Sequence, residues 1–354
     1  AVLEQENHEV RILDAMADYE KIEHLQINIF MVGTPLSKIK KELEEFKPDV
    51  VGIHCAYTVY EKDSLSVARL VKETLPKSLV VLGGAHASAS AEMLLQENKE
   101  IDLVVRGEAE YTFREIVEKY INKEIITEID GTIVRKNGSI CVNNERNFIF
   151  NLDELPMPAR HLLRMDKYLN HPQNDIGTYR KPVTDMITSR GCPQRCTFCS
   201  IFTVWKRIWR PRSAKLVVDE MEHLVKKYGI KQIRIQDDNF GIHKQRVLDI
   251  CDEIAKRKLS IKIDTPNGIG IWTLDEEMLN RMAKAGFNKL TFGIETGSQK
   301  TLEKHIKKPI AFDQAKKIIK ICNKLGIWTM STFIIGFPEE TIDDINMTRE
   351  FAKH

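Results

Sequence analysis

Short apolar runs alternate with helical patterns over the first third of the chain. Five runs predict strands, at residues 10–13, 27–32, 50–55, 79–82 and 103–105. Between them, apolar residues recur at helical spacing over residues 36–46 and 65–74. Strands and helices that alternate through short loops are typical of a parallel sheet covered by helices on both faces. The pattern therefore predicts an α/β, doubly wound, Rossmann-like domain over residues 1–122.

The alternation stops between residues 123 and 180. Two runs, at residues 132–135 and 139–142, flank the tripeptide Lys136-Asn137-Gly138. Asn-Gly between alternating runs is a strong hairpin signal. Two prolines, Pro156 and Pro158, then prevent a continued helix. We interpret residues 123–180 as a connector that carries a β-hairpin.

From residue 183 onward the alternation resumes with a longer repeat. Predicted strands lie at residues 183–188, 232–236, 260–264, 289–293 and 328–335. Predicted helices lie at residues 214–227, 244–257, 275–285, 312–325 and from about 341 onward. Repeated strand-helix units of this size predict a partial (β/α) barrel of the TIM type over residues 181–354. Chemistry in such barrels collects at the carboxyl ends of the strands.

Composition agrees with two soluble globular domains. The 354 residues are 42% hydrophobic and 29% charged, and one ordinary core does not serve a chain of that length. The 53 basic and 51 acidic residues leave a net charge of +2, so charge gives no reason to expect nucleic acid or an anionic membrane as partner. The longest uncharged stretch, residues 325–338, is shorter than the roughly 18 apolar residues of a spanning helix. We expect no membrane span.

Seven cysteines, an odd number with three crowded together, are unlike the framework of a disulfide-stapled secreted module. We therefore expect reduced cysteines and a cytoplasmic location. The chain begins with Ala1 rather than Met, and it stops at His354 inside a helical pattern. These ends predict a fragment truncated on both sides.

Three of the cysteines form a C-x3-C-x2-C motif, directly after the first predicted barrel strand. They are Cys192, Cys196 and Cys199. A closed structural zinc site requires four ligands. A [4Fe–4S] cluster held by three cysteines instead leaves one iron open. His223 and His243 are possible fourth zinc ligands, but they lie in or at the start of downstream helices, so zinc is the weaker interpretation.

This motif, with Phe198 just before the third cysteine, resembles the signature of radical S-adenosylmethionine (SAM) enzymes, in which SAM chelates the open iron. The loops after the second, fourth and fifth predicted strands match that family in order, and the resemblance covers residues 183–354. It implies a [4Fe–4S] cluster on the three cysteines. It also implies a SAM site formed by Phe198, Asp237, Asp238, Gly293, Glu295, Ser298, Ile335 and Gly336.

The first half is similar to the cobalamin-binding domain that precedes the barrel in a large subgroup of this family. The similarity lies in the loops at residues 83–88 and 106–113 and in the segment 152–160. It implies a cobalamin site formed by Tyr57, Thr58, Gly83, Gly84, His86, Ser88, Gly107 and Glu108. The Asp-x-His-x-x-Gly loop that supplies a histidine to cobalt in other cobalamin proteins is missing, and the domain's first strand is expected upstream of Ala1.

Each of these residues also has a structural interpretation. The acids Asp237 and Asp238 could cap a turn, and Glu108 could cap a following helix. The glycines at 83 and 84 could only shape a tight turn. A histidine at a strand end, such as His86, more often satisfies a neighbouring polar group than binds a metal.

One further segment, residues 205–212, packs four cations and two tryptophans together. It could grip a phosphate or an acidic substrate, or it could be a surface segment that leads into a helix capped by Ser213. The sequence does not separate these two interpretations. The remaining cysteines, Cys55, Cys141, Cys251 and Cys322, are expected to be small hydrophobic residues.

The resemblance implies a cobalamin-dependent methyltransferase that acts on an unactivated carbon of a small molecule through a 5′-deoxyadenosyl radical. It also implies a reducing electron donor such as flavodoxin or ferredoxin, and no catalytic side chain beyond the cluster ligands. An oxidative or ring-forming enzyme, similar to the anaerobic Mg-protoporphyrin monomethyl ester cyclase, is the first alternative. A methylthiotransferase acting on tRNA is disfavoured, because only Cys55 precedes residue 123. A non-catalytic iron–sulfur electron-transfer module is the alternative from another class.

Overall fold

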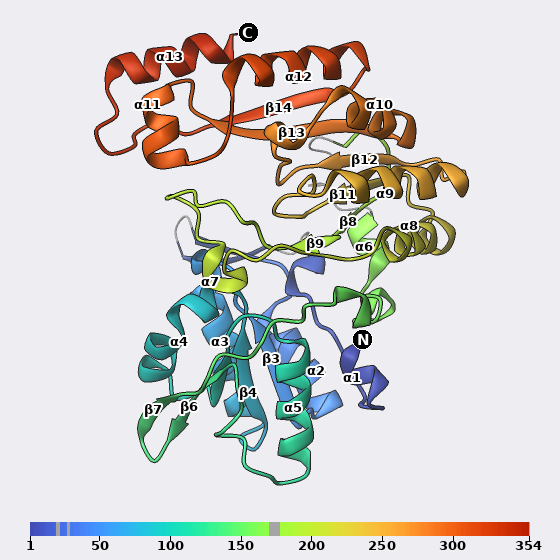
Figure 1. Ribbon diagram of the computed structural model, residues 1–354. Coiled ribbons are helices and arrows are strands. Elements are labelled where there is room, and N and C mark those ends of the chain that lie inside the picture. The colour runs from blue at the N-terminus through green and yellow to red at the C-terminus, as the bar shows by residue number, and fades with distance from the viewer. Residues whose placement is uncertain (19–21, 27–28, 170–177, 354) are drawn as a thin grey trace. The chain divides into compact units, whose positions relative to one another are not determined.

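A computed structural model describes residues 1–18, 22–26, 29–169 and 178–353. The chain divides into two compact units (Figure 1). The N-terminal unit comprises Ala1–Phe150 and Leu155–Lys167, and the C-terminal unit comprises Asn151–Glu154 and Tyr168–His354.

The N-terminal unit is built on a five-stranded sheet in the order β3-β4-β5-β6-β7. Its strands are β3 (Val50–His54), β4 (Leu79–Gly83), β5 (Leu103–Val105), β6 (Thr132–Lys136) and β7 (Ser139–Val142). The first three run parallel, whereas β6 pairs antiparallel with β5 and β7 antiparallel with β6. The carboxyl ends of β3, β4 and β5 therefore meet at one edge of the sheet, where ligands bind in folds of this kind.

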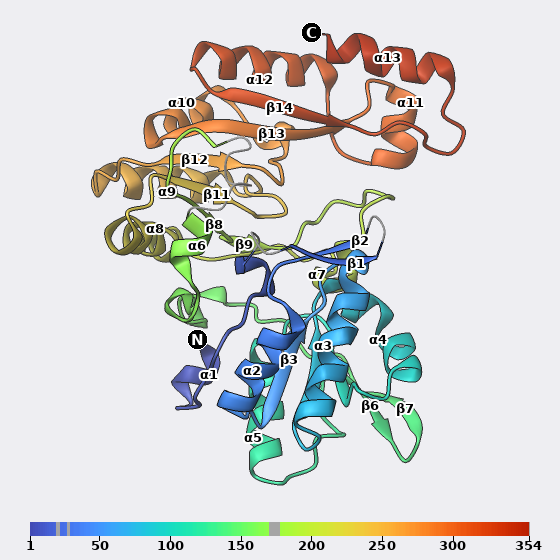
Figure 2. The same cartoon turned by 180° about the vertical axis from the view of Figure 1, so that it is seen from behind.

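Helices cover both faces of this sheet. They are α2 (Leu36–Phe46), α3 (Glu61–Thr74), α4 (Ala85–Glu97) and α5 (Glu110–Ile121). The first three share one hydrophobic core with the sheet, and α5 contributes to a second core on the opposite face. Figure 2 shows α3 in front of the sheet, and Figure 1 shows α5 in front of it. This arrangement confirms the predicted α/β, doubly wound fold.

The strand predicted at residues 10–13 is wrong. These residues are irregular, and both Ile12 and Leu13 are exposed. An apolar run becomes a strand only where a neighbouring strand pairs with its backbone groups, and none of the strand pairings among the described residues includes this run.

The strand predicted at residues 27–32 falls partly on residues 27 and 28, which lie outside the described residues. Its remainder is β2 (Ile29–Val32), which pairs antiparallel with β1 (Ile22–Gln26). These two strands form a sheet of their own rather than a part of the parallel sheet. Our placement of this run in the doubly wound sheet is therefore wrong.

The predicted hairpin is present, but it does not belong to a connector. Its turn contains Asn137 and Gly138, whose φ angles of 52° and 81° suit a two-residue hairpin turn. The first strand of the hairpin continues the N-terminal sheet, because Leu103 of β5 lies opposite Val134 of β6. The N-terminal unit consequently extends beyond residue 122.

The C-terminal unit contains five parallel strands in the order β14-β13-β12-β11-β8. They are β8 (Val183–Met186), β11 (Gln232–Ile235), β12 (Lys262–Thr265), β13 (Phe287–Glu295) and β14 (Trp328–Phe333). Each coincides with a predicted strand within a few residues. The sheet ends in β14 on one side and β8 on the other, which confirms a partial barrel (Figure 1).

The helices of this unit also follow the predictions. They are α8 (Ala214–Tyr228), α9 (Lys244–Lys256), α10 (Glu276–Ala285), α12 (Phe312–Lys324) and α13 (Ile342–Ala352). The first four bury one face of the sheet in a single hydrophobic core. Side-chain caps fix four of the starts: Ser213 accepts from Leu216, His243 from Arg246, Asp275 from Met278, and Thr341 from Asp344.

Several short elements complete the chain. In the N-terminal unit these are α1 (Val2–Gln5) and 3-10 turns at Ala15–Asp18, Thr58–Tyr60 and Arg160–Leu162. Helix α6 spans Met165–Leu169. In the C-terminal unit they are β9 (Ser189–Arg190), α7 (Phe202–Trp205), β10 (Arg210–Pro211), α11 (Gln299–Thr301), a π-helical turn at Leu302–Ile306, and 3-10 turns at Leu152–Glu154 and Ile271–Thr273.

The face of the barrel sheet away from its helices carries a row of alternating charges. Asp185, Arg234, Asp264 and Lys289 lie in register on four neighbouring strands. Arg234 binds Asp185 through two hydrogen bonds, of 2.8 and 3.0 Å. Asp264 is only 2% exposed, and burial raises its pKa to about 6 against the opposing effects of Gln232, Lys289 and Arg234.

Candidate functional site

The loop that carries the cysteine motif, here called the cysteine loop, starts at Gly191, immediately after β9. Gly191 has a φ of 84°, and a Cβ atom there would lie 2.0 Å from the backbone oxygen of Ile208. The Gly191 N–H donates to Oδ2 of Asp238, at 2.8 Å. Burial raises the pKa of Asp238 to about 6, and the Gly191 hydrogen bond opposes that rise. A glycine and an acid thus fix the start of the cysteine loop.

The three cysteines of this loop are free thiols. Cys196 is buried, and Cys192 and Cys199 are partly exposed. Burial raises the pKa of both Cys192 and Cys196. Three unpaired thiols in one loop suit an iron–sulfur cluster, because such clusters are held by cysteine thiolates.

No group of three or more His, Cys, Asp or Glu side chains within the described ranges is close enough to hold a single metal ion. A single zinc ion held by side chains needs such a group. A four-iron cluster makes a different demand, since each cysteine binds a different iron and the thiols need not meet at one point.

Asp237 braces the end of β8 and is only 1% exposed. Its carboxylate accepts hydrogen bonds from the backbone N–H and the hydroxyl of Thr188, both at 2.6 Å, and from the hydroxyl of Ser189 at 2.5 Å. Arg246 donates to the carbonyl oxygen of Thr188 at 2.7 Å. These contacts favour the structural interpretation of Asp237, and a direct contact with SAM stays a prediction that they do not support.

Glu295 ends β13 in an unusual backbone conformation, with a φ of 69°. Its carboxylate is paired with Lys308 at 2.6 Å and accepts from the Thr332 hydroxyl at 3.2 Å. The Lys308 ammonium also donates to the carbonyl oxygen of Gly293, at 3.0 Å. Sequence reasoning missed Lys308, because nothing in its local pattern distinguishes it from an ordinary surface lysine.

Gly293 makes room for this ion pair. A Cβ atom at Gly293 would lie 2.4 Å from Oε1 of Glu295 and 2.7 Å from Nζ of Lys308. A larger residue at this position would therefore displace the charged groups of the pair. Its predicted contact with SAM remains a prediction.

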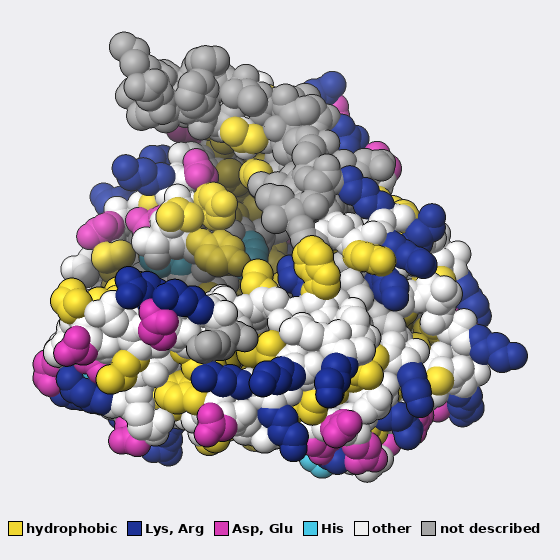
Figure 3. All heavy atoms as spheres, turned by 90° about the horizontal axis from the view of Figure 1, so that it is seen from above, with side chains coloured by type: hydrophobic (Ala, Val, Ile, Leu, Met, Phe, Trp, Pro, Cys, Tyr) yellow, Lys and Arg dark blue, Asp and Glu magenta, His cyan; other side chains and the backbone are white. Residues whose placement is uncertain are grey.

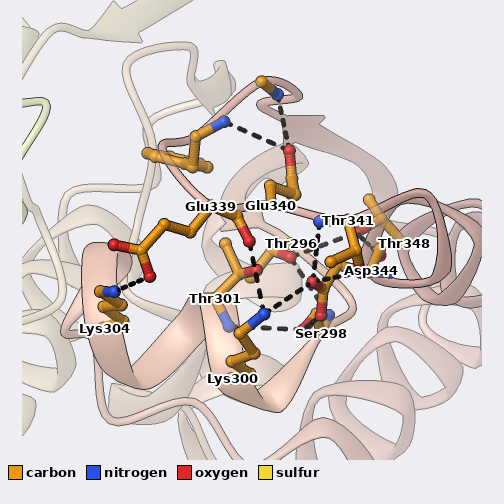
Figure 4. A network of polar contacts seen from close by, with 12 residues as sticks. Thr296, Ser298, Lys300, Thr301, Lys304, Glu339, Glu340, Thr341, Asp344 and Thr348 are labelled. Carbon is orange, nitrogen blue, oxygen red and sulfur yellow. Dashed lines mark hydrogen bonds and ion pairs between the residues drawn. The ribbon is translucent and has the colours of Figure 1, made fainter.

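Ser298 ties the loop after β13 to the start of α13 (Figure 4). Its hydroxyl donates to Asp344 at 2.6 Å, and the same carboxylate accepts from the backbone N–H and the hydroxyl of Thr341. These hydrogen bonds lower the pKa of Asp344. Ser298 is buried, so its structural use competes with the predicted contact to SAM.

A second tie lies beside the first in Figure 4. Thr296 contacts Thr348 through their hydroxyls at 3.1 Å, and the Gly297 N–H donates to the Thr348 hydroxyl at 2.9 Å. The loops that follow β13 and β14 are therefore held together through helix α13.

Aromatic rings bring the cysteine loop to these two loops. The ring of Phe337, after β14, stacks on His305 with centroids 5.3 Å apart and lies 6.1 Å from the ring of Phe198. Thr197, next to Phe198, donates twice to the backbone oxygen of His305. Ile335 is exposed nearby in sequence. The structure thus joins Phe198 to the loop that contains the predicted residues Ile335 and Gly336.

The predicted cobalamin loops meet at the carboxyl ends of β3, β4 and β5. His86 contacts Glu61 through Nε2 at 2.6 Å and Thr58 through Nδ1 at 3.1 Å. The Gly107 N–H donates to the Ser88 hydroxyl at 3.0 Å. Both ring nitrogens of His86 are engaged, so binding to cobalt would require one of these contacts to break.

Two further predicted residues have structural tasks at this edge. Gly84 has a φ of 115°, and a Cβ atom there would lie 2.7 Å from the backbone oxygen of Cys55. Glu108 does not cap α5, because its carboxylate accepts from the Ile149 N–H at 2.9 Å and the helix start has no side-chain cap. Gly83 is different, since a Cβ atom would meet nothing closer than 4.0 Å.

The same edge exposes apolar surface. Tyr57 is 64% exposed, and its ring packs edge-on against Tyr60 with centroids 6.0 Å apart. Val59 and Tyr60 are exposed as well. Exposed apolar residues grouped in this way suit a large, partly apolar ligand.

The basic and aromatic segment at residues 205–212 supports the cysteine loop. Its strand β10 pairs with β9. The guanidinium groups of Arg190 and Arg210 lie over the ring of Trp205, 5.4 and 5.8 Å from its centroid. The indole N–H of Trp209 donates to Ser189 at 3.1 Å. These contacts add a bracing role to the two interpretations that the sequence left open.

Two family profiles together cover most of the chain. That of the radical SAM superfamily matches residues 186–352, and that of the B12 binding domain matches residues 1–117. An uncharacterized methyltransferase of Pyrococcus horikoshii is 34% identical over 100% of this chain and 71% of its own length. The anaerobic magnesium-protoporphyrin IX monomethyl ester cyclase of Rubrivivax gelatinosus is 28% identical over 89% of this chain and 56% of its own length.

Among solved structures, the cobalamin-dependent S-adenosylmethionine radical enzyme OxsB, determined with aqua-cobalamin bound, has a similar fold. The TM-score is 0.74 at 24% sequence identity, over 91% of this chain and 46% of that chain. The chain thus spans about half the length of this structural relative.

Two surface features follow from the described residues. None of their helices is long and apolar enough to cross a membrane. Basic and acidic side chains are interspersed over the face drawn in Figure 3.

Proposed function

The chain belongs to the radical SAM superfamily and carries a B12 binding domain, and from this premise we infer that it transfers a methyl group to an unactivated carbon of a small molecule. The two domains imply three cofactors, which are a [4Fe–4S] cluster, SAM and cobalamin. The family to which the chain belongs contains both methyltransferases and cyclases.

One observation favours methyl transfer. The relative that matches the whole chain at 34% identity is named an uncharacterized methyltransferase, whereas the cyclase matches 89% of the chain at 28%. This match covers 71% of the length of the Pyrococcus protein, so the comparison includes most of that protein.

The residues proposed to bind the cluster and SAM lie in the C-terminal unit, and those proposed to bind cobalamin lie in the N-terminal unit. Cys192, Cys196 and Cys199 would hold the cluster, and Phe198 and Glu295 would contact SAM. When bound, the three cofactors supply radical formation and the methyl group, while the protein contributes orientation and excludes water. The exposed apolar edge around Tyr57 would receive cobalamin. No side chain needs to act as a general base.

The test uses the full chain, reconstituted anaerobically with iron, sulfide and hydroxocobalamin. SAM with a deuterated methyl group and a strong reductant are added to a small-molecule extract, which is then analysed by mass spectrometry. Methyl transfer predicts a compound that gains one deuterated methyl group. A product that gains no label, but has lost hydrogen, would favour the cyclase-like alternative instead.

The same experiment addresses the electron-transfer alternative. A module that only carries electrons would be reduced and reoxidised without consuming SAM. Formation of methionine and 5′-deoxyadenosine, or of S-adenosylhomocysteine, would exclude that alternative. Flavodoxin or ferredoxin remains our proposal for the electron donor, and the cytoplasm for the location.

A further inference from the structure

Lys308 has no role in the functions predicted above, yet it contacts three residues of the predicted SAM site. Its ammonium lies 2.6 Å from the Glu295 carboxylate and 3.0 Å from the Gly293 carbonyl oxygen. It also lies 5.8 Å from the ring centroid of Phe198. One cation therefore connects the end of β13 with the cysteine loop.

This cation is well shielded from water. The Lys308 side chain is 13% exposed and its partner Glu295 is 9% exposed. A charge pair in such surroundings interacts more strongly than one at the surface, because the local dielectric constant is lower. The ion pair therefore holds the Glu295 carboxylate in a fixed position.

The backbone around Lys308 is built to reach the cysteine loop. A π-helical turn at Leu302–Ile306 precedes it, and Lys307 follows with a φ of 54°. π-helical turns occur frequently at functional sites. The backbone oxygen of His305, inside this turn, accepts from the N–H of Thr197 at 3.1 Å and from its hydroxyl at 2.9 Å. The turn thus holds Lys308 close to the cysteine loop.

The charge of Lys308 lies beside the cysteine loop. Its ammonium is 5.8 Å from the ring centroid of Phe198, the residue directly before Cys199. A positive charge so close to the cysteines, in surroundings of low dielectric constant, favours the addition of an electron to the cluster that they are proposed to hold.

We propose that Lys308 is a positioning residue of the cluster and SAM site, which holds the Glu295 carboxylate in place and brings one positive charge to the cysteine loop. The proposal rests on the proposed function, since it requires the cluster at Cys192, Cys196 and Cys199. It adds a residue that neither the sequence motif nor its spacing identifies.

The test compares Lys308→Met with Lys308→Arg, which keeps the charge, in the full chain reconstituted anaerobically with iron and sulfide. The exposed neighbour Lys307→Met is the matched control for loss of one lysine charge. Three quantities are measured: bound iron, the reduction midpoint potential of the cluster without SAM, and the dissociation constant of SAM.

Lys308→Met should bind iron like the wild type but be harder to reduce. We expect about a tenfold lower ratio of reduced to oxidised cluster at a given potential, which is a shift of about 59 mV to more negative values for one electron. The dissociation constant of SAM should rise about tenfold, because Glu295 loses its partner. Lys308→Arg and Lys307→Met should stay close to the wild type in both quantities.

Wild-type potential and wild-type SAM affinity in Lys308→Met would overturn the proposal, and so would an equal shift in Lys307→Met. If Lys308→Met does not fold, Lys308→Gln takes its place, because glutamine keeps a donor for Gly293 without the charge. A wild-type chain that takes up no iron would refute the proposed function itself, whereas unchanged properties in an iron-loaded Lys308→Met refute only the role of Lys308.

Discussion

The adjacent acids at the end of β11 have different partners. Asp237 accepts three hydrogen bonds from Thr188 and Ser189, whereas Asp238 accepts only one, from the Gly191 N–H, among the side-chain hydrogen bonds described. Asp238 therefore retains acceptor capacity beside the cysteine loop, and of the two acids it is the better candidate for a contact with SAM. Neither assignment follows from the sequence, in which the two residues look equivalent.

The buried Asp264 makes stability depend on pH. Its pKa in the folded protein is about 6, above its ordinary value of 3.8. A carboxyl group with a raised pKa contributes most to stability below the lower value, and this contribution is lost as the pH rises through about 6. The ionised group above pH 6 then costs up to about 3 kcal/mol.

Asp264→Asn should accordingly be more stable than the wild type at pH 8, by as much as about 3 kcal/mol. The advantage should shrink as the pH falls from 6 to 4, because the wild-type carboxyl group becomes neutral. Urea unfolding at pH 8 and pH 5 measures the difference, with the exposed Asp249→Asn as control. A gain that is the same at both pH values would show that Asp264 does not titrate in this range.

Two neighbouring glycines at the end of strand β4 differ in role. Gly84 is required by the fold, whereas Gly83 leaves space for a ligand. Gly84 has a φ of 115° and meets the backbone of Cys55, so a side chain there must disturb the turn. Gly83 meets no atom closer than 4.0 Å from an added Cβ atom. The two neighbours thus offer a matched pair for testing the predicted cobalamin site.

Gly83→Leu should fold but lose bound cobalamin, because the leucine occupies the edge where the ligand is proposed to lie. Gly84→Leu should lower the free energy of unfolding by about 3 kcal/mol or more, through backbone strain and the clash with Cys55. Thermal unfolding and the corrinoid absorption that remains after gel filtration measure both effects. A Gly83→Leu protein that retains full corrinoid would move the ligand away from this edge.

At the scale of the whole molecule, the barrel unit was the more predictable half. Each of its five strands is followed by a helix, and caps at Ser213, Asp275 and Thr341 mark helix starts in the sequence itself. The run at residues 10–13 carries the same apolar signal but pairs with none of the strands in the described residues, which only the tertiary structure reveals.

The site was predictable where it follows a motif and unpredictable where it depends on the path of the backbone. The cysteine spacing indicates the cluster loop directly. Lys308 reaches Glu295 only because a π-helical turn and a left-handed residue, Lys307, redirect the chain between them. Likewise, nothing in the sequence shows that Ser298 is already bound by Asp344.

The central claim is that the cysteine loop holds a cluster that cleaves SAM, and single cysteine variants test it most directly. The full chain is reconstituted anaerobically with iron and sulfide, reduced with dithionite and assayed for bound iron and for products of SAM. Cys322→Ala is the control, because that cysteine is buried and its pKa is raised by burial to about 12. Wild type and Cys322→Ala should bind iron and consume SAM, whereas Cys196→Ala should fold but do neither. Full iron content and SAM turnover in Cys196→Ala would contradict the account.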